Sequence, residues 1–381
     1  MRILYVVNNA AFFCSHRLPL ALGARAAGYE VALATGQAGS PTLEAEALRR
    51  LASLRIPHTA TSFRSGGLHP FTEARGLLEL TGAMRRWRPD IVHCASPKGL
   101  LYGGFAARLT GCPALVLAVS GMGSLFTGDG STRLIWLRRA YSAVVRIAYR
   151  HPHRRVIVQN SDDWALVSEA GLASEEDLRL IPGSGVPLDR YVDLPLEGRQ
   201  EIVVLPGRLL KDKGVEEFVE AARRIRQSGS LWRFVLVGTA DYENPSAIPE
   251  SRVRGWVNEG VVEWWGHRAD MAEVLGQAPI VCLPSYREGM PKALLEAAAA
   301  GCAVVTTDAI GCRDAIEPGL TGDLVPIADA AQLAITLQRL IDDPARQRAY
   351  GAAGRRLARQ RFDLEAVVKA TLTIYSELLG Q

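Results

Sequence analysis

Strand-like and helix-like segments alternate along almost the whole of this 381-residue chain. Short apolar, β-branched runs read as buried strands, and longer amphipathic segments between them read as helices. Strands that alternate with helices predict parallel sheets covered by helices on both faces, so we expect an α/β protein. The expected strands are residues 2–8, 30–35, 90–96, 113–120 and 155–160, then 201–207, 233–239, 261–266, 280–285 and 302–308.

The length suggests two domains. Residues 183–200 are rich in Gly, Pro and Asp and have no clear period, which is typical of a linker. We expect two doubly wound, Rossmann-like domains that face a central cleft, 1–185 and 186–363, with the closing helix 364–381 crossing back to the first. In such sheets ligands bind beyond the carboxyl ends of the strands.

The cysteines and the apolar runs indicate the cellular compartment of the protein. No C-x-x-C pair occurs, so we expect buried thiols in a reducing compartment rather than disulfides or a zinc site. The early apolar run is too short for a signal peptide, and no run of about 18 apolar residues predicts a membrane span. We therefore expect a cytoplasmic protein. The six cysteines are Cys14, Cys94, Cys112, Cys282, Cys302 and Cys312.

The net charge of +4 is unevenly distributed. Residues 1–183 have 21 Lys/Arg against 13 Asp/Glu, or +8, and residues 184–381 have 23 against 27, or −4. The basic half indicates an anionic partner. We expect no nucleic acid, because the positive residues lie in ordinary amphipathic helices without a recognised binding motif.

Three nucleotide and metal motifs are incomplete or missing. "GSGVPL" (183–188) and "GMGSLF" (121–126) lack the third glycine of a dinucleotide fingerprint. No G-x-x-x-x-G-K-[ST] is present, which argues against a P-loop kinase. No D-x-D is present either, which argues against a diphosphate bridged by a metal.

"EGMPKALLEAAAAG" (288–301) predicts a short loop followed by a helix. Pro291 suits the first helical position and Gly301 suits the stop. The loop and first turn present backbone N–H groups at the positive end of a helix dipole, which attracts phosphate. Glu288 in the loop and Glu296 in the second turn can accept hydrogen bonds from ligand hydroxyls. A solvated Glu296, with Glu288 simply favouring the helix N-terminus, is the alternative.

"LPGRLLKDKG" (205–214) follows the first strand of the second half. Arg208 at the strand end and Lys213 at the start of the next helix are expected to converge at the carboxyl edge of the sheet. A planar guanidinium and an ammonium suit a diphosphate, and preorganised cations stabilise the charge that develops on such a leaving group. The alternative is a solvated basic turn, which is our interpretation of Lys211.

"GRLLKDKG", followed about 75 residues later by "EGMPKALLEA", resembles the large fourth family of retaining, nucleotide-sugar-dependent glycosyltransferases of the GT-B fold. The family's E-x7-E spacing matches Glu288 and Glu296. "NNAAFFCSHRLPLALGARAAGYEVALATG", "DIVHCASPKGLLYG" and "GMGSLFTG" resemble members that extend glycans on a polyprenyl-diphosphate carrier. The resemblance covers nearly the whole chain, with its more specific motifs in the second half.

The resemblance implies roles for the donor site. Arg208 and Lys213 hold the donor diphosphate, Glu296 accepts from the ribose hydroxyls, and Glu288 meets the hydroxyls of the donor sugar. Three further residues place backbone against sugar and phosphate: Gly289, Met290 and Pro291. Two more lie where such enzymes contact the base: Gly266 and Arg268. No cofactor is implied.

The acceptor side departs from the family. Many relatives have a His or an acid in the loop after the fifth strand, where residues 120–123 read Ser-Gly-Met-Gly. In retaining members the departing diphosphate can itself take the acceptor proton on the same face. That mechanism needs no protein base. His16 and His93 are alternatives for a base, although a lone His near a strand end is more often structural. The candidate acceptor residues are His16, Arg17, His93, Lys98, Ser120 and Gly121.

Residues 133–155 are a candidate membrane surface. Arg138, Arg139, Arg146 and Arg150 lie beside aromatic side chains, a combination that suits an anionic membrane. A solvated helix face is the alternative. The residues expected to face the core are Leu134, Leu137, Tyr141, Val144 and Ala148, and the aromatic residues expected beside the arginines are Trp136 and Tyr149.

These features predict a metal-independent, retaining transfer of a sugar, with UDP-N-acetylhexosamine favoured as donor by resemblance. The predicted acceptor is a saccharide on a polyprenyl diphosphate at the inner face of the cell membrane, in surface-glycan assembly. A non-hydrolysing nucleotide-sugar epimerase has the same architecture but needs acid/base pairs that we cannot assign. A non-catalytic nucleotide-sugar-binding subunit is a third possibility, against which the complete set of Arg208, Lys213, Glu288 and Glu296 argues.

Overall fold

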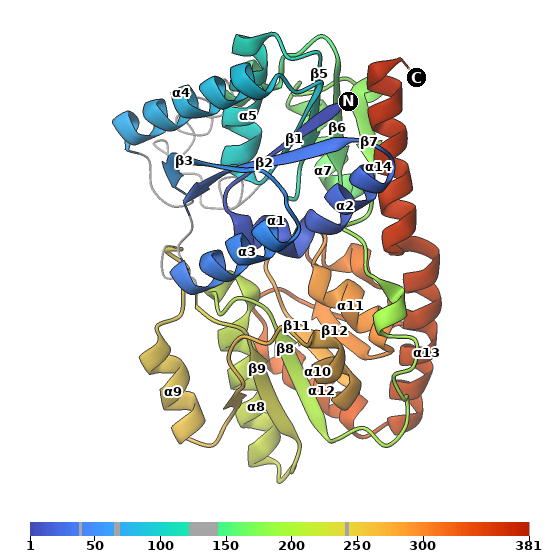
Figure 1. The fold of residues 1–381 in the computed structure, drawn as a ribbon. Helices are drawn as coiled ribbons and strands as arrows, with labels where there is room; N and C mark the ends of the chain where they lie inside the picture. The colour runs from blue at the N-terminus through green and yellow to red at the C-terminus, as the bar shows by residue number, and fades with distance from the viewer. Residues whose placement is uncertain (38–39, 65–68, 122–143, 241–243, 381) are drawn as a thin grey trace. The chain divides into compact units, whose positions relative to one another are not determined.

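The computed structural model describes residues 1–37, 40–64, 69–121, 144–240 and 244–380 (Figure 1). The chain divides into two compact units. Unit 1 consists of Met1–Ser184 together with Ala366–Gln381, and unit 2 is Gly185–Glu365. Each unit is built around one parallel sheet, so the expected α/β class with two Rossmann-like domains is confirmed.

Unit 1 has a seven-stranded sheet of order β3-β2-β1-β4-β5-β6-β7. All of its strand pairs are parallel. The strand order reverses between β1 and β4, which pair through Ile3 and Ile91. The strands are β1 (Arg2–Val7), β2 (Glu30–Gln37), β3 (His58–Arg64), β4 (Ile91–Ala95), β5 (Ala114–Ala118), β6 (Arg154–Val158) and β7 (Leu178–Leu180).

Helices cover both faces of this sheet (Figure 1). Alternate residues of β1 divide between two apolar clusters, with Leu4 and Val6 on one face and Ile3 and Tyr5 on the other. The first face packs against α4 and α5, and the second against α1, α2, α3 and α14. The helices are α1 (Ala10–His16), α2 (Leu18–Ala26), α3 (Pro41–Ser53), α4 (Pro70–Trp87), α5 (Pro97–Thr110), α7 (Ser161–Glu169) and α14 (Leu364–Leu379).

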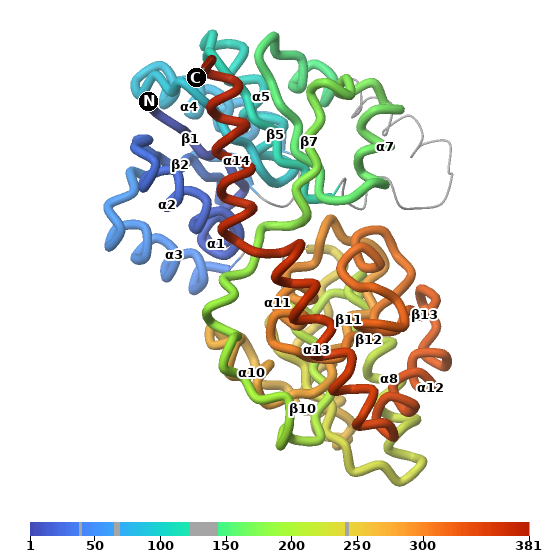
Figure 2. Tube along the Cα trace, turned by 90° about the vertical axis from the view of Figure 1, so that its right-hand side faces the viewer, coloured from blue at the N-terminus to red at the C-terminus, as the bar shows by residue number. Residues whose placement is uncertain are grey.

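The C-terminal helix α14 belongs to unit 1 over most of its length. Figures 1 and 2 show it in red beside α2. Tyr375 and Ile374 are buried in the same apolar cluster as Tyr5 of β1. The Tyr375 hydroxyl lies 3.2 Å from the Tyr5 hydroxyl, so the helix is joined to the first strand by a polar contact as well.

Unit 2 repeats the arrangement with a six-stranded parallel sheet of order β10-β9-β8-β11-β12-β13. Its order reverses between β8 and β11. The strands are β8 (Ile202–Pro206), β9 (Arg233–Val237), β10 (Glu263–Trp264), β11 (Ile280–Leu283), β12 (Ala303–Thr307) and β13 (Gly322–Val325). The helices are α8 (Val215–Gln227), α9 (Glu250–Asn258), α10 (Met271–Gln277), α11 (Lys292–Ala300), α12 (Ala330–Ile341) and α13 (Pro344–Arg361).

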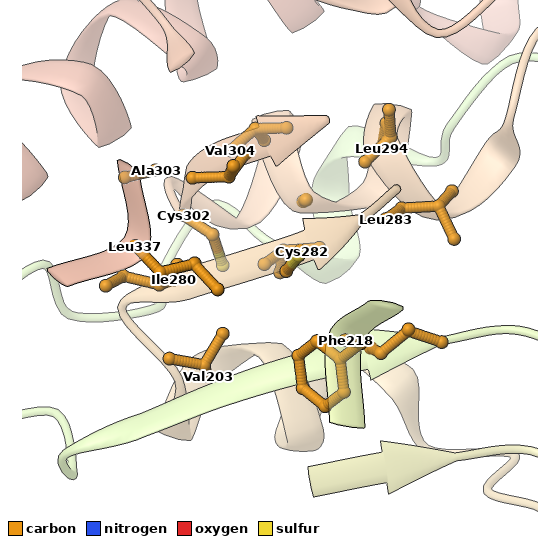
Figure 3. Packing of buried hydrophobic residues seen from close by; sticks show 14 of the residues in the cluster. Val203, Phe218, Ile280, Cys282, Leu283, Leu294, Cys302, Ala303, Val304 and Leu337 are labelled. Carbon is orange, nitrogen blue, oxygen red and sulfur yellow. The ribbon is translucent and has the colours of Figure 1, made fainter. Parts of the chain in front are cut away.

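A large apolar cluster fills unit 2. Figure 3 shows part of it, with Val203 of β8, Cys282 of β11 and Phe218 of α8. Ile202 and Val204 alternate with Val203 and pack in a smaller cluster on the opposite face. Five of the six cysteines are buried, as expected, whereas Cys14 is only half-buried.

The expected strands are all observed, with ends that differ by a few residues. Three strands were not expected: β3, β7 and β13. β3 is a polar sequence, HTATSFR, at the edge of the sheet, and it therefore lacks the apolar run that marks a buried strand. β7 is three residues long, and β13 contains Gly322 and Asp323.

Candidate active site

The loop between β11 and α11 places Glu288 at the carboxyl end of the unit 2 sheet. The Glu288 N–H donates to the Ile310 carbonyl at 2.9 Å, which ties this loop to the one that follows β12. Gly311 lies against the same loop at a φ of +79°, and a β-carbon there would come within 2.4 Å of the Glu288 carbonyl oxygen. The position of Glu288 is therefore set by its backbone and by a close approach that requires glycine.

Helix α11 begins one residue later than predicted. Pro291 is the N-cap, with an extended ψ of 107°, and Lys292 is the first helical residue. The amides of Leu294 and Leu295 donate to the Pro291 carbonyl at 2.9 and 3.3 Å, so the Lys292 and Ala293 amides precede the first intrahelical bonds. The helix end thus directs backbone N–H groups toward the carboxyl edge of the sheet, as an anion site requires.

Lys213 lies opposite Glu288, and the Lys213 ammonium contacts the Glu288 carboxylate directly. Lys213 ends a 3-10 turn, η4 (Lys211–Lys213), before α8. Gly214 follows at a φ of +70°, and a β-carbon there would lie 2.1 Å from the Pro284 carbonyl oxygen. The two loops are therefore in backbone contact, and they bring together charges 75 residues apart in the chain.

Arg208 lies on the same loop as Lys213, directly after Gly207, and its side chain is exposed. The loop is fixed by backbone bonds to its neighbours: the Gly207 amide donates to Val237 at 2.9 Å and the Leu209 amide to Thr239 at 3.0 Å. The structure thus places Arg208 and Lys213 on one loop at the reversal point between β8 and β11.

Three glycines lie together at the carboxyl ends of β8, β9 and β10. The Gly238 amide donates to the Gly266 carbonyl at 2.7 Å, and a β-carbon on Gly238 would fall 1.9 Å from the Gly207 carbonyl oxygen. Arg268, two residues beyond Gly266, forms an exposed ion pair with Asp270, Nε to Oδ1 at 2.7 Å. The hydrogen bonds from Arg268 hold the pKa of the Asp270 carboxyl well below its usual value.

Two side chains lie near Glu296 on α11. The Lys292 Nζ lies 3.3 Å from Glu296 Oε1, one helical turn away. The buried Tyr191 lies near Glu296, and its pKa is raised by burial first and by that negative charge second. Sequence reasoning missed Tyr191 because it lies in the segment assigned as a linker. An aromatic residue inside a polar linker was the available signal.

In unit 1 the predicted residues are distributed differently. His93 is only 1% exposed, and its Nδ1 lies 2.7 Å from the Tyr375 hydroxyl. Burial lowers the pKa of His93 well below its usual value, and the nearby Arg17 charge adds to this. Arg17 is itself only 6% exposed, so both residues lie in the core beneath α14 rather than on an open surface. His16 stacks on Phe12 with ring centroids 4.7 Å apart.

Lys98 is engaged by the fold. Its Nζ lies 2.7 Å from Glu73 Oε1, and both side chains are 12% exposed. Tyr102 donates to the other oxygen of the same carboxylate at 2.5 Å. Sequence reasoning missed Glu73, because an acidic residue in the first turn of a helix needs no special explanation.

Asn8 organises the reversal point of the unit 1 sheet. Its Oδ1 accepts from Ser96 Oγ at 2.7 Å and from the Lys98 and Gly99 amides at 3.1 and 3.3 Å, which satisfies the first turn of α5. Ser96 adopts a φ of +69°, a region that non-glycine residues rarely occupy. Ser120 and Gly121 follow β5 and are partly exposed. Residues 122 and 123 of the predicted acceptor loop lie outside the described residues.

The predicted membrane segment is only partly within the described residues. Residues 144–149 are helical, and Arg138, Arg139 and Trp136 lie outside the described ranges. Two predictions were wrong: Val144 is exposed, and Tyr149 is buried in the core rather than beside the arginines. Ala148 is buried as expected. Arg146 donates to the Ala170 carbonyl at the end of α7, from Nε at 2.9 Å.

None of the helices within the described ranges is both long enough and apolar enough to cross a membrane. No group of three or more His, Cys, Asp or Glu side chains in those same ranges is placed to hold a metal ion.

Comparison with known proteins agrees with this geometry. Residues 16–183 match the family model described as "Glycosyl transferase 4-like domain", and residues 200–343 match "Glycosyl transferases group 1". The N,N'-diacetylbacillosaminyl-diphospho-undecaprenol alpha-1,3-N-acetylgalactosaminyltransferase of Campylobacter jejuni is 27% identical over 311 residues, covering 78% of this chain and 80% of that protein. The UDP-Gal:alpha-D-GlcNAc-diphosphoundecaprenol alpha-1,3-galactosyltransferase of Escherichia coli is 25% identical over 284 residues, or 71% of each chain.

Solved structures share the fold over the whole chain. The Anabaena protein HepE, solved in complex with UDP, superposes with a TM-score of 0.74 at 18% identity, covering 99% of this chain and all of that one. Sucrose-phosphate synthase of Thermosynechococcus elongatus superposes with a TM-score of 0.77 at 19% identity, with full coverage of both. Together the two family models and the fold show that this chain belongs to the group 1 glycosyltransferases, with the GT-B fold.

Proposed function

We propose that this protein transfers a sugar from a nucleotide-sugar donor, with retention of anomeric configuration, to a saccharide on a polyprenyl diphosphate. The observation that supports it most is the convergence of Lys213 and Glu288 where the strand order of unit 2 reverses. Parallel α/β sheets bind nucleotides at such a point. The C. jejuni and E. coli relatives are both named for acceptors on undecaprenyl diphosphate, which supports the acceptor class.

The donor would span the carboxyl edge of the unit 2 sheet. Lys213 and Arg208 would hold the diphosphate, with the amides at the start of α11, and Glu296 would accept from the ribose hydroxyls. Gly266 and Arg268 lie on the loop after β10, where the base would rest. UDP-N-acetylhexosamine is the donor that we favour, because HepE was solved with UDP and the C. jejuni relative is named for N-acetylgalactosamine.

The Lys213–Glu288 contact has a direct chemical use. Each side chain is less than one-fifth exposed, and the two groups are in direct contact. When a donor binds, the Lys213 ammonium would turn to the diphosphate and Glu288 would accept from hydroxyls of the sugar. Because the loops already hold the two charges in place, this exchange requires little reorganisation energy.

The proposed step breaks the bond between the sugar anomeric carbon and the diphosphate oxygen. The electron pair leaves with the diphosphate, where Lys213, Arg208 and the α11 amides stabilise the added negative charge. The acceptor hydroxyl oxygen bonds to the same carbon on the same face, and its proton passes to the departing diphosphate. No protein base is needed, which fits the position of His93 in the core.

The acceptor would bind to unit 1 near the reversal point between β1 and β4, where Asn8 and Ser96 lie. The +8 charge of residues 1–183 favours an anionic acceptor and a peripheral site on the inner face of the cell membrane. Because Lys98 is paired with Glu73, a role for it at the acceptor diphosphate requires that ion pair to be exchanged.

A transfer assay tests the function. Protein is incubated with radiolabelled UDP-N-acetylglucosamine or UDP-N-acetylgalactosamine and a lipid-extracted polyprenyl-diphosphate saccharide, in excess EDTA. We expect label in the lipid fraction, because the sequence has no D-x-D to hold a metal-bridged diphosphate. Conversion of the nucleotide sugar without acceptor would favour an epimerase, and binding without any product would favour a binding subunit. Loss of transfer on chelation, restored by magnesium or manganese, would reject metal independence.

A further inference from the structure

The outer face of α4 in unit 1 exposes large apolar side chains. Phe71 is 83% exposed and Leu78 is 73% exposed. Among the described residues these are two of the three most exposed large apolar side chains, and the third, Leu231, lies in a loop of unit 2. Single exposed apolar residues are common on proteins, but two on one helix face need an explanation.

Helical spacing places the two residues on one stripe. Phe71 and Leu78 are seven residues apart, which is about two turns and about 10 Å along a helix. The opposite face of α4 is buried, through Gly76, Leu80, Thr81, Ala83 and Met84. The outward direction of the stripe is therefore fixed by the packing of the helix on the unit 1 core.

Three arginines lie close to Phe71 and Leu78 on the helix. Arg75 lies between Phe71 and Leu78 and is exposed, and Arg85 and Arg86 are exposed in the last turn. Cations favour a helix C-terminus, which accounts for Arg85 and Arg86 but not for the apolar pair beside them. Three arginines with exposed Phe and Leu form a surface that suits an anionic membrane interface.

The acidic residues of α4 are directed elsewhere. Glu73 is held inward by Lys98 and Tyr102. Glu79 pairs with Arg75 at 2.8 Å and also accepts from the Ser62 amide at 2.7 Å, which draws it toward β3. The face therefore keeps a positive balance, with Arg85 and Arg86 as the charges that Glu79 does not offset.

We propose that the α4 stripe, defined as Phe71, Arg75, Leu78, Arg85 and Arg86, docks on the anionic surface of a phospholipid bilayer. The apolar pair would enter the headgroup region while the arginines contact phosphates. This inference deepens the proposed function, since it names the surface by which a lipid-linked acceptor would be reached. Within the described part of the candidate segment 133–155, Tyr149 is in the core and Arg146 is bonded to the Ala170 carbonyl.

Flotation with liposomes tests the proposal. Wild type is compared on vesicles of phosphatidylcholine alone and with 30 mol% phosphatidylglycerol (about a third of the lipid). Three variants are tested: Phe71→Ser with Leu78→Ser, Arg85→Gln with Arg86→Gln, and a matched control in unit 2, Ile335→Ser with Arg339→Gln, which changes an exposed apolar residue and an exposed arginine on α12.

We expect wild type and the α12 control to float with anionic vesicles and to dissociate as salt rises. Each arginine removed should lower the partition coefficient about fivefold, and the apolar double variant should lower it at least about tenfold. All variants should keep the wild-type circular dichroism spectrum and melting temperature, since the changed side chains are exposed.

Several outcomes would overturn the proposal. Equal flotation of wild type and the α4 variants would assign membrane contact to another surface. Failure of wild type to float at low salt would exclude docking of the protein on an anionic membrane. A change in sedimentation of the Phe71 and Leu78 variant, without lipid binding by wild type, would assign the stripe to a second copy of the chain.

Transfer to a detergent-solubilised acceptor separates this inference from the proposed function. The α4 variants should transfer sugar at the wild-type rate in detergent and more slowly on vesicles. If wild type floats through α4 but transfers no sugar in either format, the proposed function fails and the membrane surface stands.

Discussion

The two units have the same sheet topology but use their charged residues differently at the reversal points. In unit 2 the predicted residues meet: Lys213 contacts Glu288 between the loops after β8 and β11. In unit 1 the predicted cations serve the fold, since Lys98 pairs with Glu73 and Arg17 is buried. The two contacts differ in where the partner lies, because Glu288 follows the neighbouring strand β11 whereas Glu73 is on helix α4.

Burial separates Arg17 from the Lys213–Glu288 pair, whereas the Lys98–Glu73 pair is about as buried as the unit 2 pair. The Lys213–Glu288 pair lies at the sheet edge, where we propose that a ligand phosphate takes the place of the carboxylate. Arg17 lies beside Tyr5 and Tyr375, and burial lowers its pKa. The Tyr375 hydroxyl is paired with the Tyr5 hydroxyl and with His93, so Arg17 is enclosed by a buried polar group rather than open to a ligand. We therefore expect the Lys213–Glu288 pair to exchange partners with a ligand more readily than Arg17.

The largest expected effect separates the two units. Lys213→Gln should lower kcat by roughly 10²–10³-fold, because one preorganised donor to the developing charge is removed. Lys211→Gln is the matched control on the same turn, where the side chain is exposed, and it should leave kcat unchanged. Lys98→Gln should have a smaller effect than Lys213→Gln. Steady-state kinetics that rank Lys98→Gln above Lys213→Gln would reverse the comparison between the units.

Glu296→Gln should weaken nucleotide binding, since it removes a charge-assisted hydrogen bond to ribose worth about 1.5–3 kcal/mol. Glu288→Gln should reduce turnover more than nucleotide affinity, because it faces the sugar. Calorimetric titration with UDP and GDP measures the nucleotide affinities, and the transfer assay measures turnover. Equal binding of these nucleotides to wild type and Glu296→Gln would show that the ribose role is wrong.

Tyr191→Phe should weaken UDP binding as well, but less than Glu296→Gln does. It removes the hydroxyl near the Glu296 carboxylate, so UDP affinity should fall by at most roughly 1 kcal/mol, the net value of one hydrogen bond. Tyr350→Phe is the matched control, because the Tyr350 hydroxyl donates to Asp323 at 2.9 Å within the same unit. A UDP analogue without ribose hydroxyls should bind wild type and Tyr191→Phe equally. Unequal binding of that analogue would mean that Tyr191 acts through the fold.

His93 should make the protein less stable in mild acid. Burial lowers its pKa in the folded state, so below about pH 6.5 the unfolded chain binds a proton that the folded state rejects. The stabilising contribution is thus present above pH 6.5 and is lost as the pH falls, by at most about 1.4 kcal/mol per pH unit for one proton.

The variant His93→Gln should reduce this pH dependence in urea unfolding between pH 7 and pH 5. The exposed His153, changed to Gln, is the control and should leave the slope as in wild type. His58 and His151 also have pKa values lowered by burial, so some dependence should persist in His93→Gln. An unchanged slope in His93→Gln would contradict the assignment of His93 to the core.

Much of the fold could be predicted because buried parallel strands are apolar runs of moderate length. β8 and β11 are fully buried and were found for that reason. The edge strand β3 is half polar, so its sequence resembles a loop. The predicted start of α11 was one residue too early, because Pro291 suits both the N-cap and the first helical position. The extended ψ of Pro291 in the structure makes it the N-cap.

The candidate site could be predicted where the spacing of residues along the chain determines how they are placed. Glu288 and Glu296 are eight residues apart across one helix start, so local structure determines their spacing. The contacts of Tyr191 with Glu296 and of Lys98 with Glu73 depend on how separate segments pack. The Lys98–Glu73 contact has no local signal, and Tyr191 has only its aromatic ring within a polar linker. The exposed stripe on α4 becomes visible only when the buried face of that helix is known.

The stereochemistry of transfer tests the central claim most directly. Proton NMR of the product formed from an α-linked UDP-N-acetylhexosamine and a polyprenyl-diphosphate saccharide gives the configuration of the new bond. We predict an α linkage, because the acceptor oxygen would approach on the face that the diphosphate leaves, where Lys213 and the start of α11 hold it. A β linkage would contradict this account, since it requires attack from the opposite face with a protein base that the Lys213–Glu288 site does not supply.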